Sequence, residues 1–160
     1  IRGTFEGRPV LSLITGEPEW LYPLGREVPA GWLVTGYPWE QIDDPDQVAF
    51  VEAYRARFDG EAPRLGSLLG YMVARTIAAM LEEAGSTETE AMIRALETIE
   101  VATPQGALRF RALDNQSTMG AWVGRLELGD DGRGRMTDWR YLDGADYLLA
   151  EERVRAVRSD

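Results

Sequence analysis

Two short apolar runs, each ahead of a turn, constrain the fold more than any other feature of this sequence. The first is residues 10–14, followed at once by Thr15-Gly16-Glu17-Pro18, and the second is residues 31–35. An apolar run of this length bounded by Gly and Pro is typical of a buried β-strand. Between the two runs, Pro18 and its flanking glutamates favour a short helix over residues 19–24. Strand, helix and strand with almost no polar alternation predict a parallel sheet covered on both faces.

Three helices are predicted between residues 44 and 99. Asp44 is a suitable N-cap and Pro45 fits the first helical position. Behind them runs an apolar stripe of Val48, Val51, Tyr54 and Phe58. A longer and more buried helix is expected over residues 65–81, and residues 87–90, Thr-Glu-Thr-Glu, have the form of a capping box for the third helix.

The pattern changes to short strands after Val101. Residues 108–111 alternate with period two, which favours a half-exposed strand. Residues 121–128 and 136–141 are predicted as a hairpin joined by a turn at residues 129–132. A weak terminal helix is expected in the charged tail, residues 145–160. The fold class predicted is α/β, a parallel sheet flanked by helices.

Composition excludes several classes of function. The chain has 160 residues and a net charge of −10, so no nucleic-acid partner is expected, because such binders need a basic face. It has no cysteine and no histidine. Disulfides, imidazole or thiolate metal sites and the usual Ser-His-Asp or Cys-His catalysis are therefore excluded, and neither a metal nor a cofactor is expected. No apolar stretch reaches the roughly 18–20 residues of a membrane span.

An ordered series of motifs resembles a known family over roughly residues 8–141. Thr15-Gly16-Glu17 precedes residues 31–35, and Phe50-Val51-Glu52-Ala53-Tyr54 leads to residues 58–63, Phe-Asp-Gly-Glu-Ala-Pro. Later motifs are Gly70-Tyr71, Glu83-Ala84-Gly85-Ser86, Thr103-Pro104-Gln105-Gly106 with Leu108-Arg109-Phe110-Arg111, Asp114-Asn115-Gln116-Ser117-Thr118 and Trp122-Val123-Gly124. Each motif is weak alone, but their order and spacing resemble the C-terminal part of type I periplasmic solute-binding proteins, the branched-chain amino-acid class that serves ABC transporters.

The resemblance implies two α/β lobes with a small solute held in the cleft between them. It implies that residues 1–37 belong to the second lobe, 38–113 to the first lobe, and 114–160 to the second lobe and a C-terminal tail. Family members are longer, and the chain begins at Ile1 without a signal sequence. We therefore expect an incomplete C-terminal part of an exported protein, periplasmic or lipoprotein-anchored at the cell surface with its signal peptide removed. Dimerisation or domain swapping of this part is a further expectation.

The carboxyl end of the first strand holds the sharpest candidate ligand-binding residues, Thr15, Gly16 and Glu17. Open α/β sheets place ligands at this edge. Gly16 permits close backbone approach, and Glu17 would pair with an ammonium group, as the resemblance also implies. The alternative is that Glu17 merely favours the positive end of the following helix.

Further candidates follow from the resemblance. It places Tyr37 and Trp39 at a crossover between lobes, where aromatic side chains line the cleft or, alternatively, pack beneath the hinge. It places Leu65, Gly66 and Ser67 at the start of a helix facing the cleft from the first lobe. Asp43, Asp44 and Asp46 have the side chains of a calcium site, but a helix start accounts for all three more simply.

The first functional hypothesis is the solute-binding component of an ABC import system, which delivers an amino acid or a related amide or carboxylate to a membrane permease. No bond is made or broken, so an enzyme is not expected. The alternatives are a glycosidase-like hydrolase that uses Glu17 and a second carboxylate, and a ligand-sensing domain of the same fold.

Overall fold

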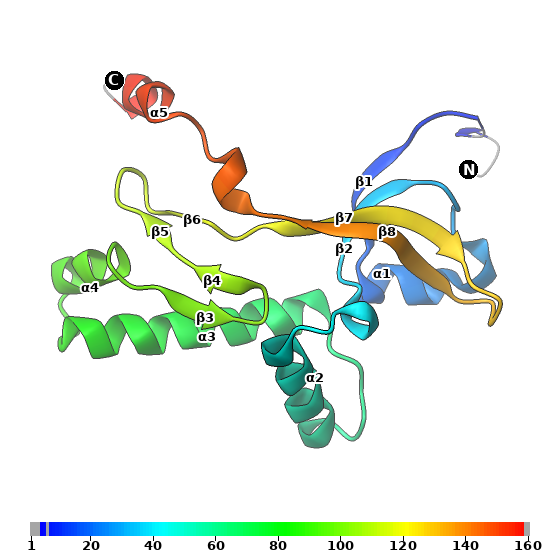
Figure 1. The fold of residues 1–160 in the computed structure, drawn as a ribbon, viewed down its shortest axis with the longest axis horizontal. Helices are drawn as coiled ribbons and strands as arrows, with labels where there is room; N and C mark the ends of the chain where they lie inside the picture. The colour runs from blue at the N-terminus through cyan, green and yellow to red at the C-terminus, as the bar shows by residue number, and fades with distance from the viewer. Residues whose placement is uncertain (1–3, 6, 159–160) are drawn as a thin grey trace. The chain divides into compact units, whose positions relative to one another are not determined.

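The computed structural model describes residues 4–5 and 7–158 (Figure 1). The chain divides into two compact units. The first comprises the described residues up to Leu68 together with Ala121–Leu142, and the second comprises Leu69–Gly120 with the described residues from Asp143 onward. The lobe boundaries expected from the resemblance, at residues 37 and 113, differ from these unit boundaries and stay a prediction.

A four-stranded mixed sheet forms the centre of the first unit. Its order is β1-β2-β7-β8, where only β1–β2 is parallel among the described strands and the other two pairs are antiparallel. The α/β class and the parallel first pair are confirmed, while the hairpin of the last two strands makes the sheet mixed. The bounds are β1 (Leu11–Gly16), β2 (Leu33–Gly36), β7 (Ala121–Leu128) and β8 (Gly134–Leu142).

The helices of the first unit lie in the connections after β1 and β2. The chain between β1 and β2 is a single α-turn continued by a 3₁₀ helix, not the one short helix expected, and Gly25 at φ 48° kinks it. The bounds are α1 (Pro18–Leu21), η2 (Tyr22–Glu27), η3 (Trp39–Gln41) and α2 (Pro45–Arg57). The long helix α3 (Leu65–Ala84) begins in this unit and continues into the second.

The core of the first unit lies on the inner face of the sheet. It is formed by side chains at most 3% exposed, namely Leu21, Val34, Tyr37, Trp122, Leu126 and Met136. Helix α2 packs through Gln47 and Phe50, both buried, whereas Val48 and Phe58 are 40% and 47% exposed. The predicted buried stripe on α2 was therefore wrong. A periodicity of apolar residues cannot show that a polar side chain such as that of Gln47 is buried.

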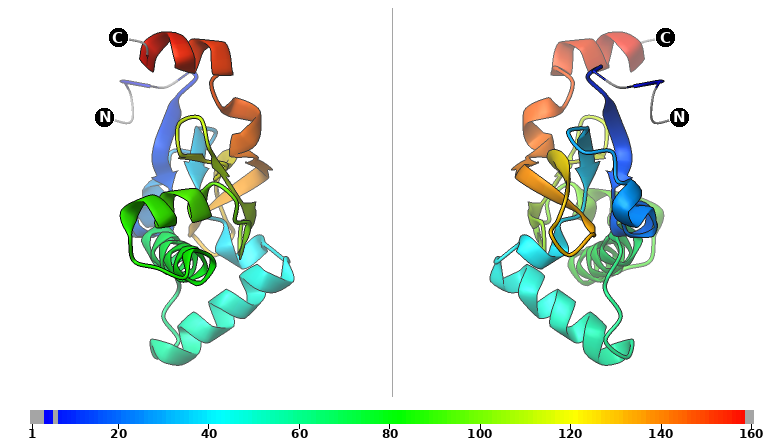
Figure 2. Two further views of the ribbon diagram at one scale, coloured as in Figure 1. Left: turned by 90° about the vertical axis from the view of Figure 1, so that its left-hand side faces the viewer. Right: turned by 90° about the vertical axis from the view of Figure 1, so that its right-hand side faces the viewer.

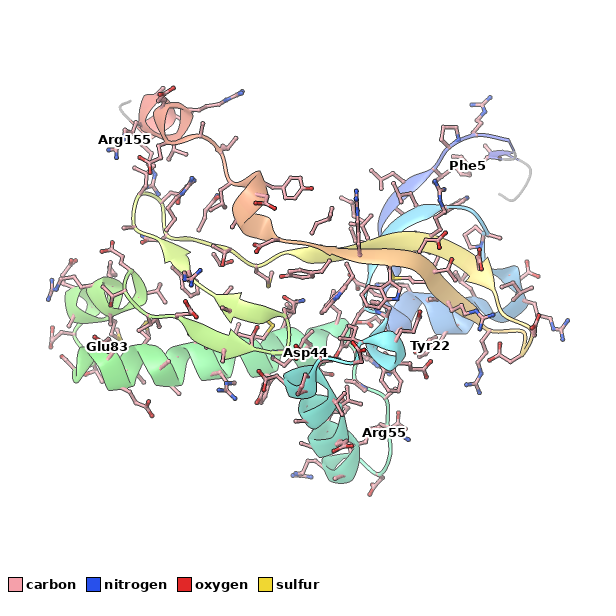
Figure 3. The ribbon with its side chains drawn as sticks, viewed as in Figure 1. Phe5, Tyr22, Asp44, Arg55, Glu83 and Arg155 are labelled. Carbon is pink, nitrogen blue, oxygen red and sulfur yellow. The ribbon has the colours of Figure 1, made fainter. Side chains whose placement is uncertain are left out.

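The start of α2 confirms the helix interpretation of the aspartate cluster. The Asp44 carboxylate accepts hydrogen bonds from the backbone N–H groups of Asp46 (2.9 Å) and Gln47 (3.2 Å), and Pro45 occupies the first turn. Figure 3 shows Asp44 at this end of α2. Among residues 4–5 and 7–158, no three acidic side chains are grouped closely enough to hold a metal ion.

Removing this cap provides a first test of the fold. Asp44→Ala leaves two backbone N–H groups without their acceptor and should lower the free energy of unfolding by about 1 kcal/mol. Urea denaturation measures the change. Asp43→Ala is the matched control, since Asp43 lies outside the cap and its replacement should cost less than about 0.5 kcal/mol. Equal losses in the two variants would contradict the assigned cap.

The second unit combines helices with two short hairpins (Figure 2). The β3–β4 hairpin and α4 lie alongside α3 in the views of Figures 1 and 2. Besides most of α3, the second unit contains α4 (Thr89–Leu96), β3 (Val101–Thr103), β4 (Gly106–Leu108), β5 (Phe110–Arg111), β6 (Gln116–Ser117), η4 (Gly144–Tyr147) and α5 (Glu151–Arg158). The tail helix is confirmed, and the single strand predicted at residues 108–111 is instead divided at Arg109.

Two predictions of burial were wrong. On β1, predicted as a buried strand, Leu11, Leu13 and Ile14 are 63%, 68% and 50% exposed, since β1 is the edge strand of its sheet. On α3, Leu68 and Met72 are buried, but Val73 and Ile77 are 58% and 47% exposed. Apolar side chains predict that a face favours burial, and they do not identify what covers it.

The predicted capping box was wrong, because α4 starts after Glu88 with no side-chain cap, and the Ser86 hydroxyl instead accepts the Glu88 N–H at 3.0 Å.

Within the described residues, no helix has both the length and the apolar character needed to cross a membrane.

Candidate functional site

The carboxyl ends of β1 and β2 meet at two glycines. Gly16 and Gly36 are paired across the strands and both are buried. A Cβ placed on Gly36 would lie 2.1 Å from the Gly16 carbonyl oxygen, and one on Gly16 would lie 2.6 Å from the Thr35 carbonyl oxygen. The absence of a side chain at Gly16 was predicted to allow a close approach to its backbone. In the structure, Gly36 of the neighbouring strand β2 makes that approach.

Glu17 occupies the N-cap position of α1 without capping it through its side chain. Its backbone is extended, and its carbonyl accepts the Trp20 N–H (3.0 Å) and the Leu21 N–H (2.8 Å). Burial raises the pKa of the Glu17 carboxyl, nearby Glu19 raises it further, and a hydrogen bond from Trp20 opposes both. A cation placed beside Glu17 would relieve this cost by stabilising the ionised form.

The other two residues of this loop differ in exposure. Thr15 is half-buried, and its hydroxyl lies 2.5 Å from the Ser12 hydroxyl. Pro18, which follows Glu17, is buried and begins α1 as expected. Thr15 therefore has a local partner on its own strand, and its role toward a ligand stays a prediction.

Tyr37 is a core residue in this structure. It is 1% exposed, its ring lies 5.3 Å from that of Trp122, and its hydroxyl accepts a hydrogen bond from the Gln47 side-chain amide at 2.5 Å. Burial raises the pKa of Tyr37 to about 12, although the Gln47 hydrogen bond opposes the shift. The packing role weighed for Tyr37 describes its contacts here.

Trp39 is half-buried and donates its indole N–H to the Tyr22 hydroxyl at 2.8 Å. With Gly16 and Tyr37 it lines a small cavity of about 30 Å³, which Pro18 and Tyr22 also border. A cavity of that volume has room for only a few water molecules, since one needs roughly 10–15 Å³. The structure thus brings Gly16, Tyr37 and Trp39 together, around a space too small for an amino acid.

Leu65, Gly66 and Ser67 lie in the first turn of α3. Leu65 and Ser67 are half-buried, Gly66 is exposed with open space around its Cα, and the Ser67 hydroxyl donates to the Tyr54 hydroxyl at 3.2 Å. These three residues do not border the 30 Å³ cavity. A separate cavity of about 180 Å³ is lined by the preceding Arg64 together with Glu61, Glu19 and Tyr22.

The arginine pair on the short strands is engaged by acidic partners. Arg111 forms an ion pair with Asp114 and donates to the Leu149 carbonyl at 2.7 Å, and Arg109 forms an ion pair with Glu100. The hydrogen bond from Arg111 lowers the pKa of the Asp114 carboxyl. These contacts occupy Arg111 within its own unit.

Sequence reasoning missed two glutamines beside the site. Gln47 supports Tyr37, and Gln41 donates to the Met136 carbonyl (3.0 Å) while accepting the Trp139 indole N–H (3.0 Å). Both glutamines follow the Tyr37-Pro38-Trp39 loop closely in sequence. No spacing rule marks them, because the partner of Gln47 is Tyr37, just after β2, and the partners of Gln41 lie on β8.

Comparison with known proteins identifies the class. The family model described as periplasmic binding protein matches residues 5–133, so the chain belongs to that family. A search of curated protein sequences gave no match.

Solved structures of ABC-type binding proteins are similar in fold. An ABC-type branched-chain amino acid transporter protein from Rhodopseudomonas palustris has 21% identity and a TM-score of 0.69, with 86% of this chain and 37% of that chain covered. An ABC transporter substrate-binding protein from Sphaerobacter thermophilus has 26% identity and a TM-score of 0.63, with 87% and 38% covered. A leucine-, isoleucine-, valine-, threonine- and alanine-binding protein from Brucella ovis has 17% identity and a TM-score of 0.71, with 92% of this chain and 40% of that chain covered. The chain thus spans about two fifths of their length.

Proposed function

We propose that this chain is part of the solute-binding component of an ABC import system and that it has no catalytic activity. The observation that carries the proposal is the family match over residues 5–133. In this proposal the protein captures a small solute between two lobes and delivers it to a membrane permease after the lobes close. Its proposed location is the periplasm or the outer cell surface.

The lobe assignment is part of the same proposal. Residues 1–37 and 114–160 would belong to the second lobe, and residues 38–113 to the first. Thr15, Gly16, Glu17 and Trp39 would face the cleft from one side, with the buried Tyr37 packed beneath the hinge. Leu65, Gly66 and Ser67 would face it from the other.

We propose a carboxylate-bearing solute, an amino acid or a related acid. One solved relative is described as binding leucine and other amino acids, and two from Rhodopseudomonas palustris are in complex with 3,4-dihydroxybenzoic acid or 4-hydroxybenzoate. Glu17 places a carboxyl group at the carboxyl end of β1, where open α/β sheets bind ligands, and a carboxylate there would pair with an ammonium group. An amino acid carries such a group and a hydroxybenzoate does not.

A thermal-shift assay on the longer protein that contains this chain tests the function. Amino acids, their amides and aromatic acids form the panel, and a true solute at about 100 times its Kd should add about 2.7 kcal/mol of stability. Glu17→Gln should abolish the shift caused by amino acids and retain that caused by aromatic acids, with Glu19→Gln as the matched control. Absence of any shift, together with hydrolysis of a glycoside, would refute the binding-protein proposal.

A further inference from the structure

A groove of about 570 Å³ lies in the first unit, far larger than the cavity beside Tyr37. Its walls come from four places in the chain: η2, η3, the end of α2, and the turn from β7 into β8. Volumes of 300–1,000 Å³ are usual for small-molecule sites. Because every residue that lines it belongs to one unit, the groove does not depend on how the two units are arranged.

Three arginines line the groove: Arg55, Arg133 and Arg135. Arg55 donates its Nε–H to the Gly60 carbonyl at 3.3 Å, and Figure 3 shows it on α2. The described ion pairs of the chain involve other arginines, at positions 109, 111 and 155. A chain with a net charge of −10 therefore gathers three arginines around one opening, and an anion bound there would pair with them.

An aromatic wall stands beside these cations. Tyr22 is 43% exposed, and Trp39 is fixed against it by the 2.8 Å hydrogen bond from its indole to the Tyr22 hydroxyl. Burial raises the pKa of Tyr22, and the Trp39 hydrogen bond opposes this. Glu40 and Arg133 line the same groove as Tyr22. A planar ring would find here an apolar face of limited mobility.

Two carboxylates limit the charge that the groove can accept. Glu40 and Asp131 also line it, so the three cations exceed the anions by one. One Asp131 oxygen already accepts the Arg133 backbone N–H at 3.0 Å within the turn. A polyanion would meet repulsion from both carboxylates, whereas a single carboxylate can pair with the arginines, whose planar groups bind it through two parallel hydrogen bonds.

We propose that this groove is a second binding site for a monocarboxylate with a planar ring, adjoining the proposed interlobe cleft, with which it shares Trp39. The carboxylate pairs with Arg133 and Arg135, and the ring lies against Tyr22 and Trp39. The site goes beyond the proposed import function, and the 160-residue chain contains all of it.

The test is isothermal titration of the 160-residue chain with benzoate at low ionic strength. Benzoate should bind, and benzamide, its neutral isostere, should bind about tenfold more weakly, as should inorganic phosphate, which has no ring. Arg133→Gln and Arg135→Gln should each weaken benzoate binding by about tenfold, and Tyr22→Ala should do so by several-fold. The control is Arg153→Gln on α5, which removes the same charge outside the groove and should leave the affinity unchanged.

The outcomes separate this proposal from the import function. Equal binding of phosphate and benzoate, no binding of benzoate, or unchanged affinity in Arg133→Gln and Arg135→Gln would overturn the groove site. None of these results affects the aliphatic amino acids of the solute panel of the longer protein, because those solutes have no planar ring for this groove. Retained benzoate binding by this chain when Glu17→Gln is introduced would support a site distinct from the cleft.

Discussion

Gly36→Ala is expected to prevent stable folding of the first unit. The added methyl group would lie 2.1 Å from the Gly16 carbonyl oxygen, 2.2 Å from its carbonyl carbon and 2.5 Å from its Cα. These are backbone atoms of the paired strand, so no rotation of a side chain can relieve the overlap. β1 and β2 would have to separate, losing their register and the hydrogen bond from the Tyr37 N–H to the Gly16 carbonyl. The free energy of unfolding should therefore fall by about 4 kcal/mol or more, which is near the upper end for single substitutions.

The comparison variant for this experiment is Gly66→Ala. Gly66 lies in the first turn of α3 with nothing within 4 Å of the Cβ that alanine would add. Alanine favours a helix over glycine, so this variant should be more stable than the native chain by up to about 1 kcal/mol. Urea unfolding followed by circular dichroism measures both. A Gly36→Ala protein within about 1 kcal/mol of the native chain would show that the strands do not approach as described.

The second large effect is a loss of stability in alkali that depends on Tyr37. Its pKa is raised to about 12 in the folded chain, against about 10 in an unfolded one. Below pH 10 both states are protonated and the free energy of unfolding does not depend on this group. Between pH 10 and 12 the unfolded chain loses the proton first, so stability falls as pH rises, by about 2–3 kcal/mol in all.

Tyr37→Phe isolates this effect. The variant should be less stable at pH 7 by about 1–2 kcal/mol, because the buried Gln47 amide loses its acceptor. It should also lose less stability than the native chain between pH 10 and 12. Adding Gln47→Leu should recover most of the cost at pH 7, since an apolar pair leaves no buried donor unpaired. Parallel stability curves for the native chain and Tyr37→Phe above pH 10 would contradict the assignment.

Local sequence patterns predicted the positions of helices and strands better than they predicted which of their side chains are buried. The first strand pair, the Asp44 cap and the β7–β8 hairpin follow from glycine, proline and N-cap residues that act within a few positions, and the structure confirms each. Burial of β1 and of one side of α3 was predicted wrongly, because it depends on which distant element covers them. The resemblance rested on motif order over most of the chain, and the family match confirms it.

The candidate site was less predictable for a similar reason. Gly16, Tyr37 and Trp39 are brought together as their position after parallel strands suggests. Arg133 and Arg135 lie far from these residues in sequence, and Gln47, although it follows the loop closely, contacts Tyr37 only because the fold returns α2 to it, so no local pattern connects these side chains to the loop. Chemistry that depends on tertiary neighbours, such as the raised pKa of Tyr37, has no signature in the chain itself.

The exposed apolar side chains of β1 and α3 also govern how this chain behaves at high concentration. An uncovered edge strand with half or more of its leucine and isoleucine surface in water is a template for pairing with another copy. At neutral pH the net charge of −10 keeps copies apart, and this repulsion vanishes near the sequence pI of 4.6. Colloidal stability therefore rests on carboxylates distributed over the surface, and mild acid removes it before it disturbs the core.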